Sequence, residues 1–257
     1  MGSTPCGARE AELPRALATF LLALTGVGFG LTWNAGAPAR AGAQTLRPVI
    51  VEHSGQKIRS KFELINDALV PVNVVIEPRS FEVTPAGEVL YLPLDPSIRL
   101  KLSAMSVRIP PRQSRWIFYE VSADSVPAWF VIPCTFSGMP KHEGLDVTVE
   151  LPHTVYLLQK EALRREDVRV HTSAYIASQG SIFLELENGS TRLGRVTSVE
   201  AIGPGGKKSY ASFPCLPKRT RQLTLPWDLP GVPETLRVRF REFVLEFPLV
   251  RSSDVAR

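Results

Sequence analysis

Short runs in which apolar and polar residues alternate recur along most of this chain. In IRSKFELI, residues 58–65, the side chains of Ile58, Ser60, Phe62 and Leu64 fall at every second position. A period of two is that of a β-strand, whose successive side chains point to opposite faces. No amphipathic helical segment is long enough to cross over between parallel strands. The pattern therefore predicts an all-β fold of antiparallel sandwiches rather than an α/β fold.

Two series of predicted strands lie on either side of a polar segment, Arg164 to Asp167. The first series covers residues 46–52, 58–65, 70–77, 89–92, 106–109, 114–121, 128–136 and 144–160. The second covers residues 168–172, 181–187, 194–201, 208–213, 221–225, 236–240 and 243–249. A chain of 257 residues is long enough for two ordinary domains. We predict an N-terminal domain over residues 44–162 and a smaller C-terminal β-sandwich over residues 163–257.

The segment before residue 44 is predicted to be an export signal. Arg9 and Arg15 precede an uncharged apolar run over residues 16–33, and small residues at 41–43 form an A-x-A cleavage pattern. A single membrane anchor is the alternative, because the run approaches the length that spans a bilayer. The cleavage pattern and the glycines in the run favour a signal peptide, residues 1–43, that is cleaved near Ala43.

Composition and motif spacing argue against several classes of function. The formal charge of +5 is modest and spread along the chain, without a dense Lys/Arg block interleaved with aromatics, which argues against nucleic-acid binding. The four histidines are isolated, so no metal site is expected. No nucleophile elbow, glycine-rich phosphate loop or paired carboxylates point to an enzyme or to a cofactor.

The cysteines leave two interpretations open. Cys6 is lost with the predicted signal, and Cys134 and Cys215 remain in the exported chain. Export permits a disulfide, but this pair comes from different predicted domains, and a bridge needs Cα atoms within about 7 Å. Two buried free thiols are the simpler interpretation.

One predicted strand is unusually long. In GLDVTVELPHTVYLLQK, residues 144–160, apolar side chains fall at every second position and only His153 interrupts the row. Most strands in globular domains are shorter. The row faces either the core of its own sandwich or a partner supplied from outside. Pro152 marks an edge or a bulge, because proline cannot donate to a strand ladder.

Four stretches, in their order along the chain, are similar to one known family. They are FELIND running into VPVNV, VRIPPRQSR, the long strand over residues 147–158, and LELENGST over residues 184–191. This order resembles the periplasmic pilus-assembly chaperones of the chaperone–usher pathway. The resemblance implies two immunoglobulin-like β-sandwich domains in tandem, a periplasmic location and a role in fimbrium biogenesis.

The resemblance also implies what the long strand does. In that family the strand donates its alternating apolar side chains to a pilus subunit whose own sheet lacks a strand. The candidate donor side chains here are Val147, Val149, Leu151, Val155 and Leu157. The implied partners are pilus or related secreted subunits, with an outer-membrane usher as a further partner and without a cofactor.

The family further anchors the subunit's C-terminal carboxylate with an arginine from the first strand and a lysine from the long strand. Charge-assisted hydrogen bonds to a carboxylate suit that task. The candidates are Arg47, His153 and Lys160, although Arg47 lies a few residues early and no lysine occupies residues 153–156. His153 serves as a cation only when it is protonated.

Two other functions are weighed against this one. A two-domain immunoglobulin-like adhesive or structural protein of the cell surface would use the whole alternating row as core. A hydrolase embedded in a β-sandwich ranks third, because no catalytic constellation supports it.

Overall fold

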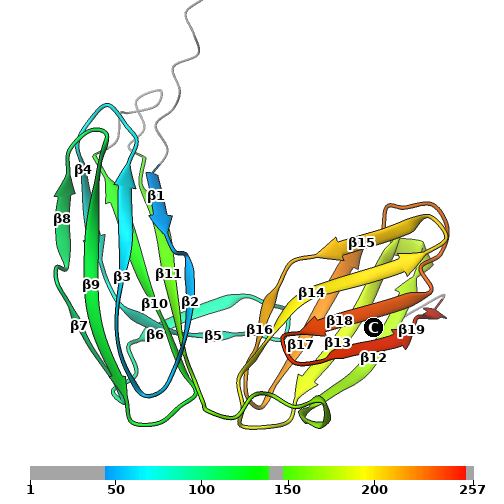
Figure 1. Ribbon diagram of the computed structural model, residues 1–257. Coiled ribbons are helices and arrows are strands. Elements are labelled where there is room, and N and C mark those ends of the chain that lie inside the picture. The colour runs from blue at the N-terminus through cyan, green and yellow to red at the C-terminus, as the bar shows by residue number, and fades with distance from the viewer. Residues whose placement is uncertain (1–43, 139–146, 253–257) are drawn as a thin grey trace, which may run out of the picture. The chain divides into compact units, whose positions relative to one another are not determined.

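The computed structural model describes residues 44–138 and 147–252, whose strands form two groups (Figure 1). The regular secondary structure of the described residues is almost entirely β-strand, with two short 3-10 turns, η1 (Arg165–Asp167) and η2 (Ala177–Gln179). In this part of the chain no helix is long and apolar enough to cross a membrane. The predicted all-β fold of two β-sandwiches is confirmed.

The first sandwich packs two sheets face to face. One sheet, called here the β3 sheet, has the order β1-β3-β9-β7. The other, the β10 sheet, has the order β2-β11-β10-β4-β8, and β5 joins it beside β10 and forms a hairpin with β6. The strands are β1 (Gln44–Arg47), β2 (Ile50–Ser54), β3 (Lys57–Asn66), β4 (Val72–Ile76), β5 (Arg79–Val83), β6 (Val89–Pro93), β7 (Ile98–Leu102), β8 (Ser106–Ile109), β9 (Gln113–Ala123), β10 (Ala128–Ser137) and β11 (Val149–Leu158).

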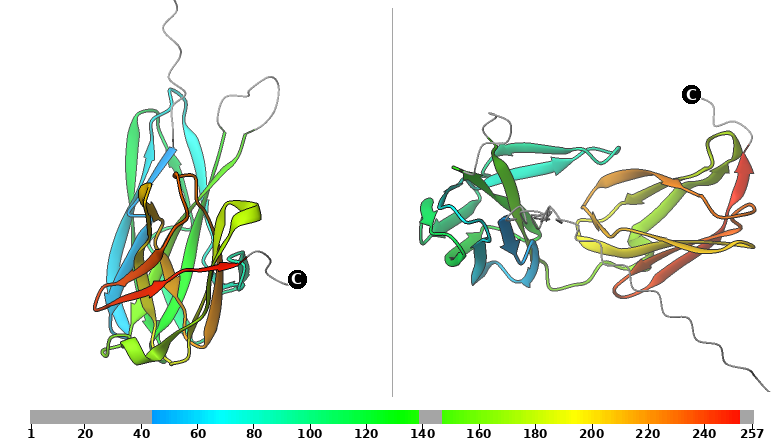
Figure 2. Two further views of the ribbon diagram at one scale, coloured as in Figure 1. Left: turned by 90° about the vertical axis from the view of Figure 1, so that its right-hand side faces the viewer. Right: turned by 90° about the horizontal axis from the view of Figure 1, so that it is seen from above.

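The second sandwich follows the same two-layer plan. Its β13 sheet has the order β17-β13-β12-β20, and its β14 sheet has the order β15-β14-β18-β19, with β16 beside β14. Figure 2 shows the strand layers in two turned views. The strands are β12 (Val168–Ile176), β13 (Ser181–Asn188), β14 (Gly194–Gly203), β15 (Gly206–Tyr210), β16 (Phe213–Cys215), β17 (Arg219–Pro226), β18 (Thr235–Phe240), β19 (Val244–Pro248) and β20 (Val250–Ser252).

Alternation along the strands builds the core of each sandwich. In the first, Phe62 and Leu64 on β3 face Phe130 and Ile132 on β10, and all four are fully buried. Burying a side chain of this size contributes about 1.5–3 kcal/mol of transfer free energy. The second sandwich has its own cluster of buried side chains from both of its sheets.

A buried asparagine closes an equivalent turn in each sandwich. Asn66, at the end of β3, donates from Nδ2 to the backbone oxygen of Ile109 at 3.1 Å and to its own turn at 2.8 Å. Asn188, at the end of β13, donates to the backbone oxygen of Cys215 at 3.1 Å and to its own turn at 2.7 Å. Both side chains are fully buried, so these bonds replace the water that the amides lose. These hydrogen bonds explain why an asparagine occupies the end of both strands.

The first predicted strand, residues 46–52, is wrong as a single strand. The chain forms β1 and β2 instead, and these lie in opposite sheets of the first sandwich. Pro48 lies between them and lacks the N–H that a continuous ladder would require. Strands β5 and β7 were not predicted, although the five residues of β7, IRLKL, do alternate with a period of two.

The remaining cysteines are free. Cys134 and Cys215 are both buried, each in the core of its own sandwich. Burial raises the pKa of each thiol to about 12, so both stay protonated and unreactive at neutral pH. The interpretation as two buried free thiols agrees with the structure.

Candidate functional site

The strand predicted over residues 144–160 is β11, which spans only Val149–Leu158. It is as long as β3, β10 and β14 and shorter than β9, so the prediction of an unusually long strand is wrong for the described residues. Only part of β11 has strand partners on both edges. Along one edge it pairs with β10 from Val149 to Leu157. Along the other it pairs with β2, in parallel, only from Thr154 to Leu158. Among the described residues, no strand pairs with this second edge over residues 149–153. We call these residues the free edge of β11; an unpaired edge is a template for a further strand.

The five predicted donor side chains divide between two environments. Val147, just before β11, is 37% exposed, and Val149 and Leu151 on the free edge are half-buried. Val155 and Leu157 are fully buried in the core of the first sandwich, beside the part of β11 that β2 covers. These two are core residues and have no surface to offer a partner. Leu145, which begins the row, lies outside the described residues.

The three predicted anchor residues make separate sets of contacts. The Nε of Arg47 lies 2.7 Å from Oε2 of Glu63, its neighbour across the β3 sheet. Lys160 is exposed after the end of β11, beside a polar pocket. His153 is buried inside the first sandwich. The structure therefore does not bring these residues together into one cationic site.

His153 is a core residue with both ring nitrogens hydrogen-bonded. Its Nδ1 lies 2.7 Å from the backbone oxygen of Pro48, which can only accept, so Nδ1 carries the hydrogen. Its Nε2 then accepts from the Tyr119 hydroxyl at 3.1 Å. The ring also stacks on Phe62, with centroids 4.7 Å apart. Burial lowers the pKa of His153 to about 4, so the ring is neutral near pH 7 and cannot act as a cationic anchor.

This buried histidine predicts that stability depends on pH. Its pKa is about 4 in the folded chain and 6.5 when unperturbed, so the unfolded chain binds the proton more readily between these values. The contribution is full above pH 6.5 and is lost as the pH falls through 4, a loss of roughly 3 kcal/mol. Urea denaturation between pH 7 and pH 4 measures it. The His153→Gln variant should show a flatter pH dependence, and an unchanged slope would contradict this assignment.

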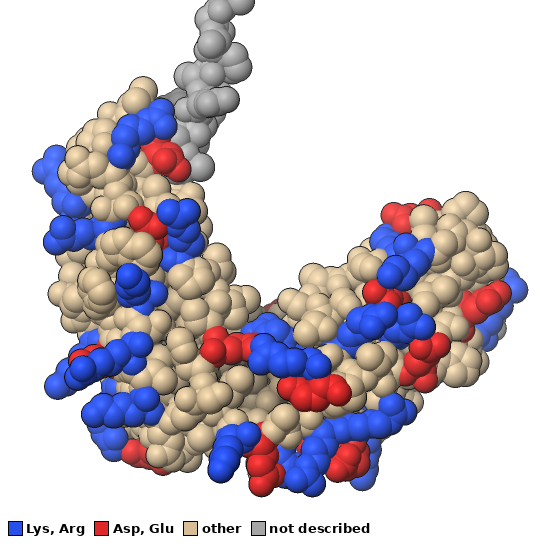
Figure 3. All heavy atoms as spheres, viewed as in Figure 1, with Lys and Arg blue, Asp and Glu red and all other residues tan. Residues whose placement is uncertain are grey.

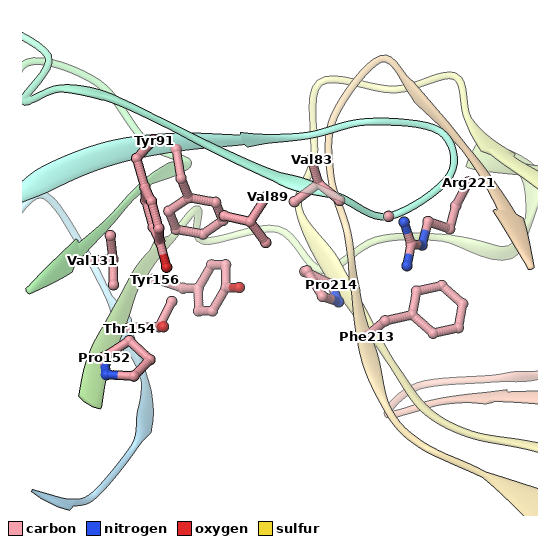
Figure 4. Close-up of a pocket in the computed structure, with 12 residues that line it drawn as sticks. Val83, Val89, Tyr91, Val131, Pro152, Thr154, Tyr156, Phe213, Pro214 and Arg221 are labelled. Carbon is pink, nitrogen blue, oxygen red and sulfur yellow. The ribbon is translucent and has the colours of Figure 1, made fainter. Parts of the chain in front are cut away.

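The other face of β11 lines an apolar pocket of about 240 Å³ (Figure 4). Pro152, Thr154 and Tyr156 reach it from alternate positions of the strand. The β5–β6 hairpin contributes more apolar side chains, and Figure 2 shows that hairpin extending beyond its sheet. The remaining lining residues named in Figure 4 are Val83, Val89, Tyr91, Val131, Phe213, Pro214 and Arg221.

Arg221, on β17, is the cation of this pocket. Its Nη1 donates to the backbone oxygen of Thr84 at 3.3 Å, and no carboxylate among the described residues lies within ion-pair distance of it. Burial lowers its pKa, although an arginine with that shift remains charged at neutral pH. An arginine without a carboxylate partner, beside an apolar wall, suits a ligand that carries both an anionic and an apolar group.

The tip of the β5–β6 hairpin is bound to β17. The backbone N–H of Gln222 donates to the backbone oxygen of Pro85 at 2.8 Å, and Arg219 pairs with Glu82 at 3.1 Å. Gly87 has a φ of +98°, and a Cβ there would lie 1.9 Å from the guanidinium of Arg221. The positive φ favours glycine at this position, and a larger residue would displace the Arg221 guanidinium.

A second set of contacts holds the C-terminal part of β11 near β14. Arg195, on β14, forms an ion pair with Glu52 on β2, and Arg241 contacts the same carboxylate at 3.0 Å. The Cζ of Arg195 also lies 4.9 Å from the ring centroid of Tyr156. These residues were not predicted from the sequence, because the ion pair joins positions 143 residues apart and neither residue lies in a local motif.

The chemistry of the site is that of binding. Among the described residues, no group of three His, Cys, Asp or Glu side chains is placed to hold a metal ion. What the arrangement offers is a free strand edge that begins with half-buried apolar side chains, next to an apolar pocket with one cation. Such a surface can bind an extended polypeptide.

Comparisons with known proteins find similarity in structure alone. No protein-family model matches the chain, and no curated protein sequence matches it. The YadV chaperone structure has 12% sequence identity and a TM-score of 0.50, and the match covers 80% of this chain and 99% of that one. A chain from the Salmonella enterica complex of SafA pilin with the SafB chaperone has 12% identity and a TM-score of 0.50, with coverage of 81% and 97%. This similarity confirms the resemblance at the level of the fold, two immunoglobulin-like sandwiches in tandem.

Proposed function

We propose that this protein is a holding chaperone that binds pilus or related secreted subunits and donates a strand to their incomplete sheets. The observation that carries the proposal is the free edge of β11, which no strand covers over residues 149–153 in the described chain. The shared fold supports it, since SafB is a chaperone in complex with a pilin. The protein works without a cofactor and is not an enzyme.

The donated row is shorter than the sequence alone predicted. Val147, Val149 and Leu151 are the members of the row that are not fully buried, and Leu151 packs against the edge of the core. We propose these three as the subunit-binding residues. Each contributes about 1.5–3 kcal/mol of gross transfer free energy when it is buried in a subunit groove. Main-chain hydrogen bonds along the free edge add affinity, and the cost of association is subtracted from the total.

We further propose that Arg221 takes the role the family assigns to its carboxylate anchor. Arg47 is paired with Glu63 and His153 is neutral, whereas Arg221 faces the pocket that Thr154 and Tyr156 line. The C-terminal carboxylate of a client would form charge-assisted hydrogen bonds with the guanidinium. The apolar side chains that precede that carboxylate would pack against the apolar wall of the pocket.

The proposed organisation follows from the same function. A leader over residues 1–43, cleaved near Ala43, delivers the chain to the periplasm. Residues 44–162 form the domain that carries the donor strand, and residues 163–257 form the smaller second domain. An outer-membrane usher is the proposed recipient of the bound subunit.

A two-domain adhesive or structural protein of the cell surface is the second candidate. The burial of Val155 and Leu157 favours it, because that function uses the alternating row as core. It gives no reason for the free edge at residues 149–153 or for a half-exposed Val147. We therefore prefer the chaperone.

Affinity capture from the native periplasm, followed by mass spectrometry, tests the proposal. The tagged protein should recover small secreted proteins of the pilin kind in a stoichiometric complex. If the capture recovers no such client from cells that express small secreted proteins of the pilin kind, the chaperone function is refuted.

A further inference from the structure

The outward face of the β3 sheet carries a cluster of cations and aromatic side chains that the proposed function does not use. We call it the basic-aromatic face and define it by Lys57, Lys61, Lys101, Trp116 and Phe118. Strand register places these residues on one side of the sheet: Lys61 lies opposite Phe118, and Lys101 lies opposite Glu120 on the same strand as Phe118. The alternate residues on the same strands, such as Phe62 and Ile117, point into the core.

The lysines of this face form no close ion pairs among the described residues. Within residues 44–138 and 147–252, no carboxylate lies within ion-pair distance of Lys57, Lys61 or Lys101. The neighbouring arginines differ, since Arg59 pairs with Glu120 at 2.7 Å and Arg99 pairs with an aspartate. Figure 3 shows more blue than red over the first sandwich. The face therefore presents a positive field to an anionic partner.

The two aromatic side chains lie among these cations. Phe118 is 55% exposed and Trp116 is 42% exposed, although both are large enough to be expected in a core. The Nζ of Lys61 lies 4.3 Å from the Trp116 ring centroid and 5.9 Å from that of Phe118. Exposed aromatic side chains beside lysines are a combination found where proteins contact the membrane–water interface.

The chain leading to this sheet favours a membrane over an acidic protein as the occupant. The uncharged run over residues 16–33 ends shortly before β1, an edge strand of the same β3 sheet. The intervening stretch of about ten residues spans at most ~35 Å. During export, before the proposed cleavage near Ala43, this stretch limits the distance between a bilayer that holds the run and the start of β1.

We propose that the basic-aromatic face docks on the anionic lipid surface of the membrane across which the chain is exported. Lys57, Lys61 and Lys101 bind the lipid phosphates, and Trp116 and Phe118 enter the headgroup region. Docking leaves the free edge of β11 unused, because that edge belongs to the opposite sheet. The inference does not depend on the proposed chaperone function.

Vesicle co-sedimentation tests it. The chain from Ala41 onward keeps every described strand, so the apolar run can be left out. It should bind vesicles that contain phosphatidylglycerol, should not bind pure phosphatidylcholine, and should be released by high salt. The triple variant K57Q/K61Q/K101Q should bind roughly 100-fold more weakly, at about fivefold for each lysine. Tryptophan emission should shift to the blue on binding, and W116F should remove the shift.

Matched controls separate the face from net charge. Arg164, Arg169 and Arg251 are exposed cations on or near the second sandwich, and R164Q/R169Q/R251Q should keep the wild-type vesicle affinity. All variants should retain the wild-type melting temperature. Equal binding of the two triple variants, or binding to polyglutamate without binding to anionic vesicles, would overturn the proposal; the second result would indicate an acidic protein partner.

Discussion

Replacing Val149 and Leu151 by aspartate should abolish client capture while the protein remains folded. Two charged side chains on the free edge cannot enter an apolar subunit groove, and the lost transfer free energy alone corresponds to at least 100-fold weaker binding. Both side chains are only half-buried in the free protein, so we expect V149D/L151D to lower the free energy of unfolding by about 1–2 kcal/mol. Co-purification from the periplasm measures the first effect, and urea denaturation measures the second.

Val75 provides the matched control. It is an exposed apolar residue on β4, in the same sheet as β11 but away from the free edge. V75D should capture the client as the wild type does. If V149D/L151D unfolds outright, the row is core along its whole length and the adhesive or structural function gains support.

Replacing Leu157 by alanine should have the opposite result, a large loss of stability without a specific loss of client binding. Leu157 is fully buried between the sheets of the first sandwich, in the part of β11 that β2 covers. Removing a buried leucine side chain costs about 2–5 kcal/mol, from lost transfer free energy and from the cavity that remains. Urea denaturation checks the stability, and client affinity per folded molecule should be unchanged.

The neighbouring Leu158→Ala variant is the comparison for that experiment. Leu158 is half-buried and its side chain points to the other face of the strand, so its truncation should cost distinctly less than that of Leu157. If L157A loses its client at full stability, Leu157 contacts the client directly, and the division of β11 into two halves is wrong.

Alternation along the chain predicted the all-β class and most strand positions, because burial on one face of a strand leaves a period of two in the sequence. The two asparagine turns were also visible as short motifs. The separation of β1 from β2 was missed, although Pro48 is the local signal that marks it. The short strand β7 was also missed, although its sequence IRLKL has a period of two.

The candidate site was predictable only in part. The sequence located the long strand, but the same alternation describes a row that faces its own core and a row that faces a partner. The His153 environment, the Arg195–Glu52 ion pair and the Arg221 pocket all depend on residues that are far apart in the chain. No local pattern encodes such pairings.

The amino-acid sequence by itself determined that β11 is a strand and that its odd-numbered side chains, apart from His153, are apolar. Only the tertiary structure decided which of those side chains are core. Val155 and Leu157 are core because they pack against the facing β3 sheet. The edge of β11 is decided by β2, which pairs with it from Thr154 onward and stops short of residues 149–153. A strand edge is free or covered according to where another segment of the chain ends, and that is a property of the packed fold rather than of the strand's own residues.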